Sequence, residues 1–187
     1  TFVTVGGSGT ILTSSNGNSW TSRSGTSNTL YGITYGNSSF VTVGDNGTIL
    51  TSGDGTSWTA RTSGITSTEL YGSNELYGVT YGNSIFVTVG DSGYILTSSN
   101  GNSWTSRTSG TSENLRGVTF GNGLFVTVGV WENILTSPDG TTWTQRRSIN
   151  PLQRDHGNLN YLWEVTYGNG LFVTVGKQGT ILTSSDG

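Results

Sequence analysis

Residues 40–61 read FVTVGDNGTILTSGDGTSWTAR, three short β-type segments separated by turn signals. Val, Ile, Thr, Phe and Trp favour strands, whereas Gly, Asp and Asn clusters favour turns. The first two segments carry apolar residues at adjacent positions, as in Phe40-Val41 and Ile49-Leu50. Adjacent apolar positions indicate a strand that is covered on both faces. The stretch therefore predicts antiparallel strands inside a stack of sheets.

The same pattern recurs along the whole chain. FVTVG begins at Phe2, Phe40, Phe86, Phe125 and Phe172, and each copy is followed by ILTS. A further β-type segment, such as GITY or GVTY, precedes four of the five copies. Units of about 40 residues with four antiparallel strands are typical of β-propeller blades.

We therefore predict a single-domain, all-β protein, a β-propeller of four-stranded antiparallel blades. The chain opens on the second segment of a unit and closes on the third. Five blades would form a nearly complete ring and are our prediction, whereas six to eight would leave it open. The predicted units are 1–29, 30–75, 76–114, 115–162 and 163–187.

A stretch of the form Ser-x-[Asp/Asn]-Gly-x-[Ser/Thr]-Trp joins the third and fourth segments of four units, and its first four residues, SSDG, recur at 184–187. Its acidic position is Asn in two of the copies. A general acid or a metal ligand needs a carboxylate, whereas Asp and Asn serve a turn equally well. We therefore predict that these stretches form structural turns and that their tryptophans pack beneath the turns. The predicted structural residues are Asn16, Gly17, Trp20, Asp54, Gly55, Trp58, Asn100, Gly101, Trp104, Asp139, Gly140 and Trp143. The Asn-Gly or Asp-Gly pair is expected to form a two-residue hairpin turn with positive φ angles.

This stretch resembles the Asp-box, or bacterial neuraminidase repeat, of β-propellers on bacterial surfaces and in secreted proteins, although Gly follows the Asp directly here. The resemblance implies a propeller fold and an extracellular or cell-surface location. Sialidases of this type use three arginines that converge on one carboxylate. The recurring arginines here, Arg23, Arg61, Arg107 and Arg146, occupy equivalent outer-strand positions in different units. We expect them to be solvated and far apart.

Composition excludes several classes of function. Eight Lys and Arg residues against eleven Asp and Glu give no basic surface for nucleic acid. The absence of Cys and the single His argue against zinc or thiolate sites. The sequence contains no run of 18 apolar residues, the length that would predict a membrane-spanning helix. We therefore predict no metal, no cofactor, no nucleic-acid partner and no membrane span.

The places where the repeat fails are the candidate functional positions. Insertions at 62–78 and 146–164 both follow the fourth segment of a unit, and the turn at 130–133 reads VWEN where others read GSGT or DNGT. In an up-and-down blade all three would emerge on the same face, opposite the Asp-box turns. Glu164 stands where other units have Gly. The candidate ligand-binding residues are Trp131, Glu132, Arg147, Asp155, His156, Tyr161, Trp163 and Glu164.

Aromatic rings with a few charges on loops suit a sugar or peptide ligand. We therefore expect a non-enzymatic extracellular binding or display propeller that recognises a glycan or a surface protein. One alternative is a structural repeat protein that self-associates through its incomplete terminal blade into oligomers or filaments. The other is an Asp-box glycoside hydrolase with a carboxylate pair drawn from Glu132, Asp155 and Glu164. A Ser-His-Asp arrangement around His156 is formally possible, but no accompanying motif supports it.

Overall fold

The computed structural model describes residues 1–66, 74–147 and 161–187. In these residues the chain forms five antiparallel sheets. The first contains β1 (Phe2–Val5), β2 (Ile11–Ser14) and β3 (Thr21–Arg23), the second β4 (Leu30–Gly36), β5 (Ser39–Gly44), β6 (Ile49–Ser52) and β7 (Thr59–Arg61). The third contains β8 (Leu76–Gly82), β9 (Ile85–Gly90), β10 (Ile95–Ser98) and β11 (Thr105–Arg107). The fourth contains β12 (Leu115–Gly121), β13 (Leu124–Gly129), β14 (Ile134–Ser137) and β15 (Thr144–Arg147), and the fifth β16 (Leu162–Gly168), β17 (Leu171–Gly176) and β18 (Ile181–Ser184).

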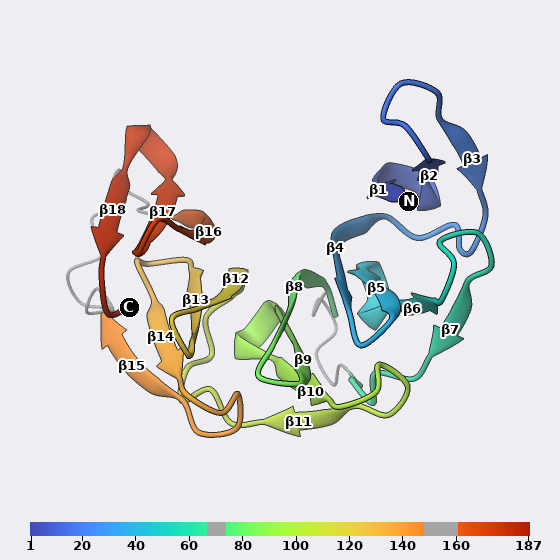
Figure 1. Ribbon diagram of the computed structural model, residues 1–187. Helices are drawn as coiled ribbons and strands as arrows, with labels where there is room; N and C mark the ends of the chain where they lie inside the picture. Colours follow the sequence, from blue (N-terminus) through green and yellow to red (C-terminus); the bar gives the residue numbers. More distant parts are fainter. Residues whose placement is uncertain (67–73, 148–160) are drawn as a thin grey trace.

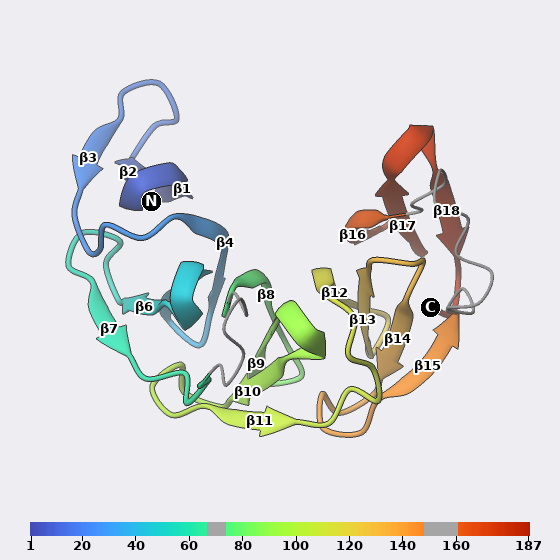
Figure 2. The same ribbon diagram turned by 180° about the vertical axis from the view of Figure 1, so that it is seen from behind.

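The sheets are arranged radially, one after another, in an open arc (Figure 1). Strands β4, β8, β12 and β16 line the inside of the arc, and β3, β7, β11 and β15 lie on the outside. Figure 2 shows the same order from behind, with the first and last sheets on either side of the opening. The nearly complete five-bladed circle is therefore not formed, although the five sheets and their strand order agree with the sequence pattern.

Every sheet has two different apolar faces, and neighbouring sheets pack one face of each type together. In the second sheet Val41, Val43 and Ile49 point one way, and they pack against Phe86 and Leu96 of the third sheet. We call the first type the valine face and the second the phenylalanine face. The same pairing recurs at each of the four junctions between sheets. In the three middle sheets both faces of the short strands are thus covered, which explains their adjacent apolar residues.

Glycines bring the inner strands into close contact. A Cβ on Gly121 would lie 2.1 Å from Cγ of Tyr167 in the next sheet, and one on Gly36 would lie equally close to Tyr81. Side chains at these positions would push neighbouring sheets apart. The spacing of the sheets around the arc therefore depends on glycine at these positions.

The connections leave the sheets on two opposite faces. The first two strands of a four-stranded sheet are joined by two-residue turns, as at Asn37 and Ser38, whose φ angles are 46° and 58°. Asn37 contacts the carbonyl of Ser99 in the next Asp-box turn, so both connection types share one face. On the other face, single-turn 3-10 segments η1 (Gly7–Gly9), η2 (Asp45–Gly47), η3 (Asp91–Gly93) and η5 (Lys177–Gly179) lie beside the starts of the inner strands. We call the latter face the axial face.

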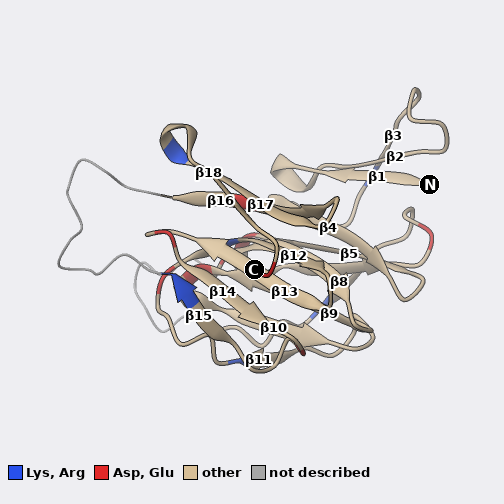
Figure 3. Cartoon of the chain, turned by 60° about the vertical axis from the view of Figure 1, so that its left-hand side comes forward, with Lys and Arg blue, Asp and Glu red and all other residues tan. Residues whose placement is uncertain are grey.

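Few charged side chains interrupt this framework. Lys, Arg, Asp and Glu occur mainly at turns and strand ends rather than along the sheets (Figure 3). Basic residues gather at the end of β15, where the turn sequence also departs from the repeat. The axial end of the fourth and fifth sheets is therefore a candidate functional region.

Candidate functional site

The Asp-box stretches form one recurring turn. In the second sheet the Ser52 hydroxyl accepts a hydrogen bond from Gly55 N at 2.8 Å, and Asp54 accepts from the backbone N–H groups of Thr56 and Ser57. Trp58 Nε1 donates to the Gly55 carbonyl at 3.1 Å. Asn16 and Asn100 accept the same backbone hydrogen bonds in their own turns. The side chain at this position thus organises backbone, and Asn performs that task as well as Asp.

These turns are longer than the sequence pattern suggested. Only the glycine has a positive φ angle, 79° at Gly17 and 77° at Gly55, and the preceding Asn or Asp does not. The prediction of a two-residue turn here was wrong, because the Ser and Asx side chains close a wider loop. The two-residue turns with two positive φ angles lie between the first and second strands instead.

The recurring arginines do not converge on one point. Nε atoms of Arg23, Arg61, Arg107 and Arg146 each donate to a threonine hydroxyl in their own sheet, at 2.8–3.0 Å. The first three are half-buried rather than fully solvated. Each holds its outer strand against the neighbouring strand, so the arrangement offers no sialidase-type cluster of guanidinium groups.

The turn after β13 keeps the backbone form of the other four turns and departs from them in sequence. Trp131 and Glu132 have φ angles of 58° and 53°, and Glu132 stands where the other turns have Gly9, Gly47, Gly93 or Gly179. Side chains with a Cβ are strained in this left-handed region, at a cost of about 1–2 kcal/mol per residue. Such an outlier marks a position where the side chain itself has a task.

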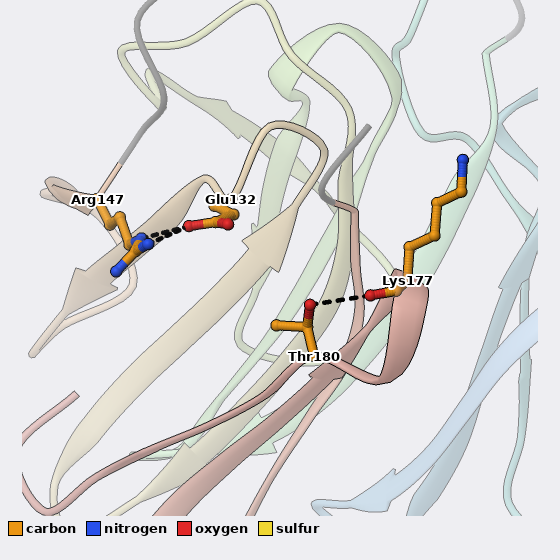
Figure 4. Close-up of polar contacts among 4 residues, drawn as sticks. All are labelled: Glu132, Arg147, Lys177 and Thr180. Atoms are coloured by element: carbon orange, nitrogen blue, oxygen red, sulfur yellow. Dashed lines mark hydrogen bonds and ion pairs between the residues drawn. The ribbon is translucent and has the colours of Figure 1, made fainter. Parts of the chain in front are cut away.

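Glu132 is buried, with 6% of its surface exposed, and its carboxylate is ion-paired with Arg147 (Figure 4). The Arg147 Nε donates to Glu132 Oε2 at 2.5 Å. Strand β15 is one residue longer than the other outer strands, and its register shifts between Ile134 and Leu135. This extra residue brings Arg147 to the turn while Arg146 keeps the repeat's bond to threonine.

The fourth and fifth sheets bring several predicted residues together. The rings of Trp131 and Tyr161 meet edge to face with centroids 6.0 Å apart, and those of Tyr161 and Trp163 with centroids 5.4 Å apart. Lys177 N donates to the Tyr161 carbonyl at 2.7 Å, and its Nζ lies 5.7 Å from the Tyr161 ring. In Figure 4 the Lys177 carbonyl accepts a hydrogen bond from Thr180. The predicted residues Asp155 and His156 lie outside the described residues.

Glu164 lies on the inner strand β16 beside the fourth sheet. A Cβ added to Gly117 would lie 2.9 Å from Glu164 Oε1, so the carboxyl group lies close to the backbone of β12. Glu164 Oε1 accepts a hydrogen bond from Val165 N at 3.0 Å. Although the residue as a whole is exposed, the surrounding chain partly removes water from its carboxyl group and raises its pKa.

The inner strands contribute a second group of side chains that continues the aromatic cluster. Tyr31, Tyr77, Arg116 and Trp163 occupy equivalent positions, each directly after the buried leucine that begins its strand. The Tyr31 and Tyr77 rings lie 5.4 Å apart. The Arg116 guanidinium lies 4.0 Å from the Tyr77 ring centroid and 5.7 Å from that of Trp163.

Together these contacts make one row across four sheets, which we call the axial row. Its members are Tyr31, Tyr77, Arg116, Trp163, Tyr161 and Trp131. The last three were predicted from the sequence as ligand-binding residues, and the first three were not. The missed signal was the residue after the leucine that begins each inner strand, because it reads Tyr, Tyr, Arg and Trp in successive repeats.

Carboxylates support the tyrosines of the axial row. Tyr77 Oη is 2.7 Å from Asp91 Oδ1 and also contacts Glu75, and Asp91 is only 3% exposed. Burial, followed by these hydrogen bonds, raises the pKa of Tyr77. Hydrogen bonding to Asp45 similarly raises the pKa of Tyr31. Both phenols therefore stay protonated at neutral pH.

A separate apolar hollow of about 410 Å³ lies beside β18, between the fourth and fifth sheets. Val128, Ile134, Val165 and Leu182 contribute to its lining. At the preceding junction Trp143 covers the corresponding region. The hollow therefore reflects the free outer edge of β18 rather than a set of convergent polar groups.

Among the described residues, no three His, Cys, Asp or Glu side chains are grouped so that they could hold a metal ion. The described part of the chain also contains no helix long and apolar enough to cross a membrane.

Comparison with known proteins gives the fold. No family model matches the chain, and no curated protein matches it. Virginiamycin B lyase from Staphylococcus aureus is similar in structure, with a TM-score of 0.67 and 13% identity over 97% of this chain and 68% of that one. YCF48 from Cyanidioschyzon merolae has a TM-score of 0.64 and 16% identity over 97% of this chain. The chain has a β-propeller fold.

These similarities are structural, since the identities are too low to carry function. The chain spans 62% of the length of the YCF48 chain. A computationally designed protein, Ika4, matches with a TM-score of 0.61 and 14% identity over 87% of this chain and 94% of its own. A second YCF48 structure, bound to D1 peptide, also matches, with a TM-score of 0.61 and 16% identity over 96% of this chain and 62% of that one.

Proposed function

We propose that this propeller is a non-enzymatic binding module that holds an extended segment of a partner protein along the axial row. The observation that carries the proposal is the continuity of the row: ring and guanidinium contacts of 4.0–6.0 Å link side chains from four neighbouring sheets. Aromatic and arginine side chains are the groups that most often dominate protein interfaces.

Exposure in the row supports binding rather than packing. Trp163 and Tyr31 are 44% and 45% exposed, although both belong to strands that begin with a fully buried leucine. Rings that only filled the core would be buried as Phe86 and Phe125 are. The rings are rigid and amphipathic, so they offer contact area to a partner at low entropic cost.

The backbone strain at Glu132, the neighbour of Trp131, supports the same role. The other four turns have glycine at the position of Glu132, yet here a side chain is kept in the left-handed region, and the adjacent Trp131 contacts the Tyr161 ring of the row. A peptide partner is preferred over a glycan because YCF48, a propeller of similar structure, has been solved with a bound peptide. Extracellular or surface location and a distant relation to Asp-box propellers remain part of this proposal.

Selection from a displayed library of random 12-residue peptides tests the function. Clones that bind the wild-type chain are expected to lose binding to Trp163→Ala and to keep it with Trp20→Ala, because Trp20 is equally exposed, at 43%, and lies away from the axial row. Clones that tolerate Trp163→Ala would refute the site. Glycan-array signals that depend on Trp163, without peptide binders, would favour a glycan ligand instead.

A second candidate, assembly of copies end to end, is favoured by the two outermost faces. Ile181 and Val175, on the valine face of the fifth sheet, are 65% and 44% exposed, and Phe2, on the phenylalanine face of the first, is 57% exposed. These two face types pack together at every junction within the chain. Apolar faces of this kind invite heterologous contacts.

Sedimentation of two single variants tests this assembly. Phe2→Glu and Ile181→Glu each block one of the two faces, so each variant alone is expected to be monomeric. An equimolar mixture would form a one-to-one complex, because one intact face of each type remains. A monomeric wild-type chain at high concentration would rule the assembly out.

A further inference from the structure

The arginines of the described chain differ in one respect, the acceptor for the Nε–H group. Five of the six described arginines donate from Nε to an oxygen of the chain, a threonine hydroxyl for four of them and Glu132 for Arg147. Arg116 is the exception, because its Nε is buried and has no hydrogen-bond partner. A buried donor without an acceptor is unusual in a folded protein.

The surroundings of Arg116 hold its guanidinium in a defined plane. The group lies over the Tyr77 ring, and Trp163 lies on a neighbouring strand at 5.7 Å. Stacking uses the faces of a guanidinium and leaves the N–H groups in its plane for other partners. Two parallel N–H bonds from this plane match the two oxygens of a carboxylate.

The charge of Arg116 is also without a direct counterion. In the described ranges the only ion pair within 4.0 Å joins Arg147 and Glu132. The nearby carboxylates of Glu75 and Asp91 contact the Tyr77 hydroxyl. Arg116 is thus a cation that the chain orients without a direct ion pair.

We propose that Arg116 binds one carboxylate of the partner segment and so sets the register of that segment along the axial row. This inference rests on the proposed function. The carboxylates of Glu75 and Asp91 lie at the hydroxyl of the Tyr77 ring, and the carboxyl group of Glu164 lies beside Gly117, the neighbour of Arg116. A run of acidic residues is therefore disfavoured, and the fitting ligand carries a single carboxylate between apolar or aromatic neighbours.

A titration followed by proton–nitrogen correlation of the arginine Nε groups tests the inference without a known partner. The probe is N-acetylaspartate N-methylamide, and the neutral isostere N-acetylasparagine N-methylamide is the control, at matched sodium chloride. The Arg116 signal, identified by its loss in Arg116→Gln, is expected to shift saturably with the aspartate probe alone. Signals of Arg23, Arg61 and Arg107 serve as internal controls and are expected to stay in place, because their Nε groups already have acceptors.

Arg116→Lys provides a variant that keeps the charge and loses the planar fork. Saturation-transfer measurements are expected to show aspartate-probe binding weaker by about tenfold in this variant. An unmoved Arg116 signal, an equal shift with the asparagine analogue, or equal affinity in Arg116→Lys would overturn the inference. The titration reads Arg116 alone, so it can fail while peptides still depend on Trp163, and it can succeed if they do not.

Discussion

The phenylalanine that begins the second strand of each sheet gives a matched test of the stacked arrangement. Phe125 is fully buried, 4.6 Å from the Phe120 ring and packed against the valine face of the third sheet. Phe2 has the same place in the first sheet, but no preceding sheet covers it and 57% of it is exposed. The same substitution at the two sites therefore differs in what the neighbouring sheet and the inner strand contribute.

The expected costs follow from burial. Replacing a buried phenylalanine by alanine removes its transfer energy and leaves a cavity, so Phe125→Ala is expected to lower the free energy of unfolding by about 3–5 kcal/mol. Full burial of such a side chain is worth about 1.5–3 kcal/mol, and Phe2 retains less than half of that, so Phe2→Ala is expected to cost about 1 kcal/mol.

Equilibrium urea denaturation followed by circular dichroism measures both costs. Phe86→Ala is the second buried member of the set, since Phe86 is also fully buried, and it should match Phe125→Ala. Equal losses for Phe2→Ala and Phe125→Ala would show that the sheets do not stack in this order, and the assignment of valine and phenylalanine faces would be wrong.

Three further predictions concern the turns and the inner strands. Gly121→Ala should lower the free energy of unfolding by about 1–3 kcal/mol, because its Cβ would meet the next sheet. Gly168→Ala should change the free energy of unfolding by less than about 0.5 kcal/mol, since no atom lies within 4 Å of the added Cβ. Urea denaturation midpoints compare the two variants. Hydrogen bonds in their turns hold the pKa values of Asp54 and Asp139 below the ordinary range. The unfolded state therefore takes up protons first as the pH falls below about 4, and the folded state loses stability. The double variant Asp54→Asn, Asp139→Asn should show a smaller loss of stability in acid and little change in stability at neutral pH. An unchanged dependence of the melting temperature on acid pH would count against this prediction. Glu132→Gly and Glu132→Ala remove the same carboxylate, but only Ala keeps a Cβ at a φ of 53°, so the Ala variant should be less stable by about 1 kcal/mol, and equal melting temperatures would contradict the strain.

Much of the fold could be predicted from the repeat because strand pattern and turn chemistry are local. The adjacent apolar residues, as at Phe40 and Val41, correctly indicated strands covered on both faces. The Asn and Asp exchange correctly pointed to backbone hydrogen bonding, as Asn16 and Asp54 both show. The order of the strands also correctly predicted that the Asp-box turns and the altered turn at Trp131 lie on opposite faces of the propeller.

Other features depended on geometry that no single stretch contains. The angle between neighbouring sheets is set by contacts such as Gly121 against Tyr167, so counting repeats did not reveal that five sheets form an open arc. The two-residue turn was misplaced because an Asn-Gly pair also fits a wider loop closed by side chains. Tyr31, Tyr77 and Arg116 were missed because only the structure brings equivalent positions of separate repeats into contact.

The most direct test of the account is the affinity of one peptide selected on the wild-type chain, measured by isothermal titration against four variants. Trp163→Ala and Tyr31→Ala, both in the axial row, should weaken binding by about tenfold or more. Trp20→Ala and Tyr35→Ala remove rings of similar or greater exposure outside the row and should change the affinity by less than about twofold. Equal effects of the two pairs, or none from the first, would contradict a binding surface at the axial row.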